Sequence, residues 1–243
     1  MDEQYETGIV TFLDIIGFSD RIKDSESPQE LLKILNDLKD SARHGVITLG
    51  TQKKNYQVIS EEKESSHDIA FFNDCYIRIK KKNSLCFKEY FQNEIKDICE
   101  IYIFGILNDF LIRGGISYGK YYINESHDIC IGEAVINAHS LESSEADYAR
   151  IILDKNLNDK IEGINSLIKL PENDYYQIDY LEYIKTAPDF QKDTDSDVFK
   201  KHKVLIEKGL KSKEEIITTK FEKLKSYHNG NCKEKFEKFC VSG

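Results

Sequence analysis

The sequence predicts an α+β fold in which helices cover one face of a largely antiparallel sheet. Short apolar segments with strand character alternate with segments of helical periodicity over the first 155 residues. Two of the strand segments are separated only by Asn73 and Asp74, which is hairpin spacing. A long amphipathic segment begins at Phe87. This order of strand, helix, hairpin, helix and strand is typical of an α+β layer architecture.

The first elements follow from apolar spacing and capping residues. Residues 7–13 (TGIVTFL) are mostly apolar and contain no charge, which predicts a buried strand. A helix is expected after Ser27 and Pro28, because serine suits the N-cap and proline the first helical position. Its apolar positions are Leu31, Leu32, Ile34, Leu35 and Leu38. Residues 69–72 and 75–79 then predict the hairpin.

The next elements complete the predicted core. Apolar residues return every three or four positions over residues 87–111, which predicts one long helix. Residues 112–123 predict a strand, residues 132–142 a short helix, and residues 149–153 another strand.

The composition changes after Lys155. A strand is expected at residues 175–178 and a charged helical stretch at residues 196–226, with a helix stop at residues 228–230. We therefore divide the chain into a core, residues 1–155, and an extension, residues 156–243, packed on that core.

The bulk properties exclude several classes of protein. The formal net charge is -9, and a diffuse acidic field of this kind disfavours nucleic-acid binding. No apolar run approaches the roughly 20 residues that span a bilayer, and the acidic N-terminus lacks the order of a secretory signal. The six cysteines show no zinc-type spacing and are expected to be reduced thiols. We expect a cytoplasmic protein that binds neither nucleic acid nor a membrane.

Two aspartates are the main candidates for chemistry. Asp14 ends the first strand just before Gly17, and Asp74 lies in the hairpin turn. Each alone is an ordinary turn aspartate. Two carboxylates at neighbouring strand ends, one beside a glycine turn with free N–H groups, predict a site for divalent metals and a triphosphate.

Four segments resemble motifs of the class III nucleotidyl cyclases, which have a ferredoxin-like catalytic domain. Residues 12–19 (FLDIIGFS) are similar to the first metal motif, and residues 72–74 (FND) fall where the second metal aspartate stands. Residues 113–119 (RGGISYG) look like the R-x-G-I-x-x-G strand. Residues 131–142 (IGEAVINAHSLE) are similar to the helix written G-x-A-V-N-x-A-x-R-L-E. The four occur in the family's order.

This resemblance implies the roles of the site residues. Asp14 and Asp74 would be catalytic and would hold two Mn²⁺ or Mg²⁺ ions per site, with the Ile15 carbonyl as a further ligand. The β- and γ-phosphates would meet backbone N–H groups of Gly17, Phe18 and Ser19. Arg113 is expected to contact phosphate; the alternative is an ion pair on the sheet. Class III sites lie between two subunits, so the resemblance also implies a homodimer.

The chain departs from the family at the residues that stabilise the transition state and select purines. Ile136 stands at the asparagine position, with Asn137 one place later, and Ser140 stands at the arginine position. Ala70 lies near the position of the adenine-reading lysine. Other possible contacts to the transition state or the base are Asn137, His139 and Tyr56.

A compact chain with an altered set of base-recognition residues resembles the pyrimidine cyclases of the Pycsar antiphage system. These enzymes convert UTP or CTP to cUMP or cCMP, which activates a separate effector protein. Two alternatives stay open at this point: an adenylate or guanylate cyclase in signalling, and a catalytically degenerate cyclase-fold module that only binds nucleotides.

Overall fold

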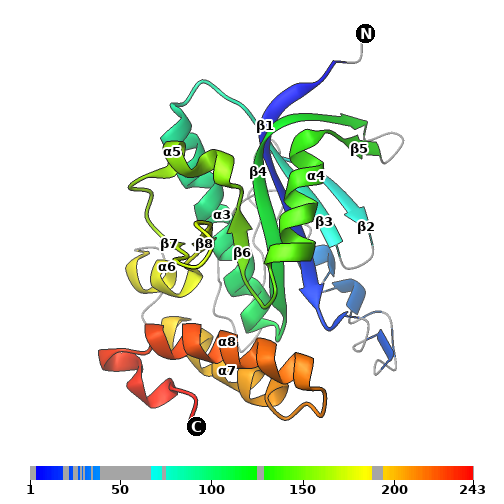
Figure 1. Ribbon diagram of the computed structural model, residues 1–243. Helices are drawn as coiled ribbons and strands as arrows, with labels where there is room; N and C mark the ends of the chain where they lie inside the picture. The colour runs from blue at the N-terminus through cyan, green and yellow to red at the C-terminus, as the bar shows by residue number, and fades with distance from the viewer. Residues whose placement is uncertain are drawn as a thin grey trace.

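A mixed sheet runs through the molecule in the order β2-β3-β1-β4-β6-β8-β7, with β5 paired to β4 outside this path (Figure 1). The computed structural model describes residues 4–18, 22–23, 27, 29, 31–33, 35–38, 67–72 (backbone only), 75–124, 129–187 and 194–242. The strands of the described part are β1 (Glu6–Ile16), β2 (His67–Phe72), β3 (Cys75–Lys81), β4 (Leu111–Asn124), β5 (Ile129–Ile131), β6 (Ile151–Leu153), β7 (Leu167–Lys169) and β8 (Tyr176–Ile178). The helices labelled here are α3 (Phe87–Leu107), α4 (Glu133–Ser140), α5 (Asn158–Ile161), α6 (Tyr180–Thr186), α7 (Thr194–Gly209) and α8 (Glu215–Asn231).

The first four strands have a ferredoxin-like arrangement. β1 lies between β3 and β4 and is antiparallel to both, and β2 forms a hairpin with β3. The order β2-β3-β1-β4, with α3 connecting β3 to β4, is that of a split β-α-β unit. The predicted α+β class is therefore confirmed. The described residues 31–33 and 35–38 are helical, as expected between β1 and β2.

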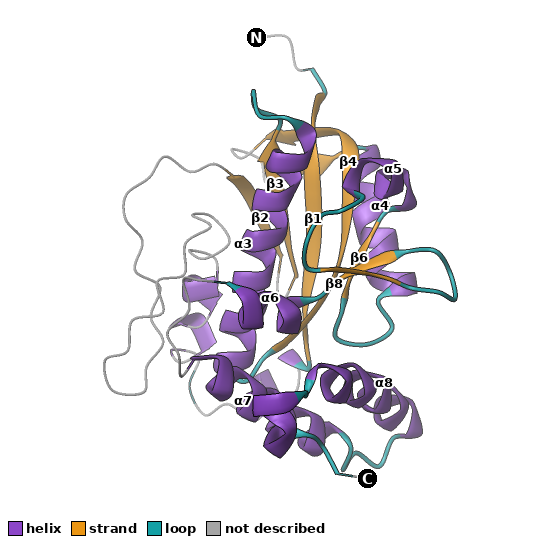
Figure 2. Ribbon diagram, turned by 90° about the vertical axis from the view of Figure 1, so that its left-hand side faces the viewer, coloured by secondary structure: helices purple, strands orange, loops and turns teal. Residues whose placement is uncertain are grey.

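Helices cover both faces of this sheet, so the expectation of a single covered face is wrong. Ile9 and Leu13 of β1 pack in the core that contains α3, whereas Val10 packs with Ala134 and Ala138 of α4. Successive residues of a strand point to opposite faces, and β1 is apolar on both. Figures 1 and 2 show α3 and α4 on opposite sides of β1 and β4.

Two predicted helix ends differ from those of the structure, by four residues for the long helix and by one for the last. The helix expected over residues 87–111 ends at Leu107. Asp109 then takes a positive φ of 65°, a conformation that aspartate tolerates better than most residues, and the chain turns into β4. The stop expected at residues 228–230 lies inside α8, because His228 is fully buried against α7 rather than placed at an exposed end. The stretch expected over residues 196–226 forms two helices, α7 and α8, instead of one.

A buried ionic cluster fastens α3 to the sheet. Arg78 of β3 is fully buried, and its guanidinium bonds both carboxylate oxygens of Glu94 at 3.0 and 3.1 Å. It also bonds Asp97, while the Thr11 hydroxyl donates to Glu94 at 3.1 Å. The paired charges hold α3 in one register across β1 and β3.

The residues after Lys155 add to the sheet and to the helical layer. β6 pairs with β4 in parallel, and β8 and β7 extend the sheet beyond it. Helices α6 and α7 contact α3. The division into a core and an extension stays a prediction. Within the described part of the chain, none of the helices combines the length and apolar character of a membrane span.

Candidate active site

Asp14 lies at the centre of the candidate site, on the face of the sheet that α4 covers. Its Cα partners are Cys75 on β3 and Arg113 on β4. One carboxylate oxygen, Oδ1, accepts a hydrogen bond from the Cys75 thiol at 3.4 Å. The other, Oδ2, accepts one from Arg113 Nε at 2.7 Å. The side chain is 13% exposed, so it is mostly withdrawn from solvent yet still reachable.

The β2–β3 hairpin brings the second acidic segment to Asp14. β2 ends at Phe72 and β3 begins at Cys75, which confirms the predicted hairpin. Asn73 and Asp74 lie outside the described residues. Cys75, which follows Asp74 in the sequence, is the strand partner of Asp14. Past Asp14, the paired residues Ile15 and Ile16 have only β4 as a strand neighbour in the described part of the chain.

Arg113 is held between two carboxylates. Its Nε lies 2.7 Å from Asp14 Oδ2 and 2.8 Å from Oε1 of Glu142, a buried residue in the π-helical turn Leu141–Glu145. Burial lowers the pKa of the Arg113 guanidinium, but the bond to Asp14 and the charges of Glu142 and Asp14 together raise it. These contacts are the ion pair on the sheet that the sequence analysis gave as the alternative for Arg113. Contact with phosphate stays a prediction.

The turn after Asp14 has the backbone that a phosphate site needs. Gly17 takes a φ of 74°, and a Cβ there would meet no atom of the described residues within 4 Å. Phe18 is buried in the core and anchors the turn. Ser19, the third predicted phosphate contact, lies outside the described residues, as does Tyr56.

The residues of α4 that are candidates for contacts to the base or the transition state point in different directions. Asn137 Nδ2 donates to Asp154 Oδ2 at 3.3 Å, and the Ser117 hydroxyl donates to the same oxygen at 2.7 Å. Ile136, one position earlier, is 68% exposed. Neighbouring helical residues point about 100° apart, so Asn137 does not face where an asparagine at position 136 would.

His139 and Ser140 complete the exposed side of α4. The His139 ring meets Phe12 of β1 edge-on, with the ring centroids 4.9 Å apart. This contact brings the imidazole to the face that carries Asp14, two residues along β1 from Phe12. Ser140 is exposed at the end of the helix.

Sequence reasoning assigned no role to Glu142, Cys75 or Asp154. Glu142 lies in the segment that resembles the helix motif, and Cys75 follows Asp74 directly. The sequence therefore placed both residues beside predicted site residues. Their contacts with Arg113 and Asp14 depend on the register of β1 between β3 and β4, which the sequence alone does not specify.

The described residues around Asp14 supply only part of a site for a hard divalent cation. A carboxylate and the backbone carbonyls at a strand end are oxygen ligands of the kind that Mg²⁺ and Mn²⁺ prefer. No group of three or more His, Cys, Asp or Glu side chains in the described residues is arranged to hold a metal ion. The proposed site thus depends on Asp74 for its second carboxylate.

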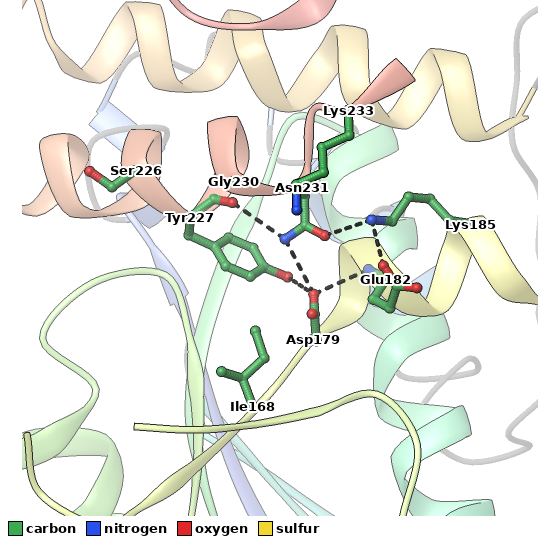
Figure 3. Close-up of a pocket in the computed structure, with 9 residues that line it drawn as sticks. All are labelled: Ile168, Asp179, Glu182, Lys185, Ser226, Tyr227, Gly230, Asn231 and Lys233. Carbon is green, nitrogen blue, oxygen red and sulfur yellow. Dashed lines mark hydrogen bonds and ion pairs between the residues drawn. The ribbon is translucent and has the colours of Figure 1, made fainter. Parts of the chain in front are cut away.

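A separate pocket of about 430 Å³ lies between β7, α6 and α8 (Figure 3). Asp179 Oδ1 accepts hydrogen bonds from the Tyr227 hydroxyl at 2.8 Å and the Glu182 N–H at 3.1 Å. Lys185 Nζ donates to Asn231 Oδ1 at 2.9 Å. Burial raises the pKa of Asp179, although these hydrogen bonds lower it. The polar groups of the pocket bond one another and join α6 to α8, and none of the predicted site residues lines it.

Comparisons with known proteins give a remote structural likeness. No family model matches the chain, and no curated protein matches it in sequence. Among solved structures, the crystal structure of the guanylyl cyclase Cya2 is similar with a TM-score of 0.47 and 13% identity, over 73% of this chain and 94% of that chain. A likeness this weak adds nothing to the argument about activity, which rests on the residues and the topology.

Proposed function

We propose that the protein is a nucleotidyl cyclase that converts a pyrimidine nucleoside triphosphate to a 3′,5′-cyclic mononucleotide and pyrophosphate. The observation that carries the proposal is the convergence of separate motifs on Asp14. The first motif supplies Asp14 itself, the third supplies its strand partner Arg113, and the second ends one residue before its other strand partner, Cys75. Segments about 60 and 100 residues apart therefore meet at one carboxylate, in the order the class III motifs require.

Each group of predicted site residues would have a separate role in the cyclisation. Asp14, Asp74 and the Ile15 carbonyl would hold two Mn²⁺ or Mg²⁺ ions, which when bound supply activation of the ribose 3′-hydroxyl and neutralisation of the phosphates. The backbone N–H groups of the turn at Gly17, Phe18 and Ser19 would orient the β- and γ-phosphates. The positive φ of Gly17, and the absence of described atoms within 4 Å of a Cβ there, support this role.

A homodimer is part of the proposal. Ile129 and Ile131 of β5 are 44% and 48% exposed, and Ile136 of the adjacent α4 is 68% exposed. Three exposed isoleucines on contacting elements favour burial against another surface. We assign that surface to a second copy of the chain, because class III sites are completed across a dimer interface.

The pyrimidine substrate and the antiphage role rest on the departures from the purine-cyclase pattern. Ala70, Ile136 and Ser140 replace the residues with which purine cyclases read the base and stabilise the transition state. The product would be cUMP or cCMP, recognised by a separate effector protein in the cytoplasm. Asn137, His139 and Tyr56 remain proposed contacts to the base or the transition state.

One experiment tests the activity and its specificity. The pure protein is incubated with Mn²⁺ and each of ATP, GTP, UTP and CTP, and the products are separated by chromatography and identified by mass. Cyclic product from UTP or CTP is expected. Cyclic product from ATP or GTP alone would replace the substrate assignment with that of a purine cyclase in signalling.

A non-catalytic nucleotide-binding module is the second candidate, and a specific observation favours it. Asp14 is already engaged by Arg113, and Ser140 offers no positive charge where the family has arginine. Saturable binding of a triphosphate without turnover of any of the four would identify this function.

A further inference from the structure

Arg113 and a divalent cation compete for the same carboxylate. In this structure Arg113 Nε is 2.7 Å from Asp14 Oδ2, one of the oxygens that a metal ion would need. A guanidinium and a divalent cation on one carboxylate repel each other strongly at such a short distance. A metal ion on Oδ2 therefore requires that the guanidinium leave that oxygen.

Glu142 offers the guanidinium a second position. Its Oε1 lies 2.8 Å from the same Nε, and its side chain is only 5% exposed, compared with 13% for Asp14. A carboxylate this deeply buried needs a nearby cation more than a partly exposed one does. Because the Nε hydrogen is donated to Asp14 in this structure, a cation at Asp14 would displace the guanidinium toward Glu142.

We propose that Glu142 is a positioning residue that retains Arg113 when Asp14 binds a divalent cation, an inference that rests on the function proposed above. Without metal, Arg113 neutralises both carboxylates and keeps Asp14 in place beneath α4. With metal, Glu142 holds the guanidinium beside the site without blocking Asp14. The π-helical turn that follows α4 places Glu142 at this position.

The test measures Mn²⁺ affinity directly, from the decrease of the electron paramagnetic resonance signal of free Mn²⁺, with no nucleotide present. Wild type is compared with Glu142→Gln, Arg113→Gln and the double variant. The matched control is Glu145→Gln, which removes a carboxylate from the same turn without contacting Arg113. Thermal melts by circular dichroism establish that each variant is folded.

Four results are expected. Glu142→Gln weakens Mn²⁺ binding roughly tenfold or more, a range typical of residues that orient metal ligands. Arg113→Gln binds Mn²⁺ more tightly than wild type, because the competing cation is gone. In the Arg113→Gln background, the loss caused by Glu142→Gln shrinks by at least about threefold, since coupled residues are not additive. Glu145→Gln binds as wild type does.

Other outcomes overturn the inference at identifiable points. Equal losses from Glu142→Gln in both backgrounds would mean that Glu142 acts through its charge alone, without Arg113. Wild-type affinity in Glu142→Gln would remove any role for this residue while leaving the cyclase proposal intact. If wild type binds no Mn²⁺ at all, the metal site itself fails and the proposed function fails with it. Should Arg113→Gln not fold, Glu142→Asp replaces it: a retained carboxylate must restore most of the affinity that Glu142→Gln loses.

Discussion

Asp14 contacts both strands that flank β1 through one side chain. Its two oxygens have different partners, the Cys75 thiol and the Arg113 guanidinium, and both partners come from the strands that flank β1. The sheet thus fixes the carboxylate before any ligand arrives. Preorganisation of this kind makes a bound cation's position depend on strand register rather than on a mobile loop.

Removing either proposed metal carboxylate is expected to abolish cyclisation. Asp14→Ala and Asp74→Ala should each lower product formation by at least roughly 100-fold, because loss of a ligand costs no less than loss of the residues that orient it. The measurement is product per unit time from the preferred triphosphate with Mn²⁺. Asp159→Ala, an exposed position on α5, is the control and should retain wild-type turnover. Wild-type-like turnover from Asp14→Ala would remove the metal argument.

A pair of buried histidines predicts how stability depends on pH. His228 Nε2 lies 3.0 Å from the Phe239 carbonyl and must donate, so a neutral His228 accepts at Nδ1 from His202 Nδ1, 2.9 Å away. His202 Nε2 then accepts from the Tyr180 hydroxyl at 3.1 Å. Burial lowers the pKa of both imidazoles, and for His228 the charge of Lys203 also lowers it while the Phe239 bond raises it. The bond between the two Nδ1 atoms is lost when both rings are protonated, because each would then be a donor.

The sign of the effect follows from these shifts. As pH falls through the ordinary histidine pKa of 6.5, the unfolded chain takes up protons that the folded chain resists. The free energy of unfolding therefore decreases below about pH 6.5, by up to about 1.4 kcal/mol per pH unit for each histidine. Urea denaturation at pH 7.5, 6.5 and 5.5 measures this slope. The double variant His202→Gln, His228→Gln should show a shallower slope, and an unchanged slope would contradict the assignment.

At the scale of elements, the packing of α4 against β4 determines the positions of Glu142, Asn137 and His139. Gly115 of β4 makes this possible, because a Cβ there would fall 2.2 Å from the Ala138 carbonyl oxygen and 2.6 Å from Leu141 Cβ. Only a residue without a side chain lets the helix approach this closely. The position of α4 is thus set by the strand beneath it.

Gly115→Ala is expected to displace α4. The added methyl meets helix backbone, which cannot move aside alone, so stability should fall by about 1–3 kcal/mol and product formation should fall with it. Gly119→Ala on the same strand is the matched control: its Cβ would lie 3.6 Å from Ala134 Cβ, an ordinary contact, and the change should stay below about 1 kcal/mol. Urea denaturation of both variants makes the comparison. Equal stability of the two would mean that α4 is not held by close contact at Gly115.

The sequence was sufficient for most elements of the first 155 residues, but not for β5, β7, α5 and α6 or for the contacts between elements. Strand β1, the hairpin and β4 were predictable because apolar runs and a two-residue turn are local signals. The end of α3 was not, since the apolar period continues past Leu107 although the helix ends there, with Asn108 as C-cap and a positive φ at Asp109. The ion pairs of Arg113 and the direction of Asn137 arise from tertiary register and from the turn of α4. These contacts join residues that are far apart in the sequence, so residue spacing along one sequence does not reveal them.

At the scale of the whole molecule, the proposed dimer makes activity and assembly inseparable. Ile136→Glu places a charge on the exposed isoleucine surface of β5 and α4, where burial against a second copy would desolvate it. Sedimentation analysis should show a shift toward monomer, with at least a roughly tenfold loss of product formation at the same protein concentration.

The control for this prediction is Ile216→Glu on α8. Ile216 is 74% exposed, even more than Ile136, but it lies on another element. This variant should keep both the mass and the turnover of wild type. Loss of association in both variants would point to a general effect of added charge, and a monomeric yet fully active Ile136→Glu protein would contradict the shared-site account.

The most direct test of the central claim is a crystal structure with Mn²⁺ and a non-cyclisable pyrimidine triphosphate, with anomalous scattering recorded to locate the metal. The account predicts anomalous peaks roughly 2.1 Å from carboxylate oxygens of both Asp14 and Asp74, with the triphosphate against the turn at Gly17. Peaks elsewhere, or carboxylates of Asp14 and Asp74 on opposite faces of the sheet, would contradict it.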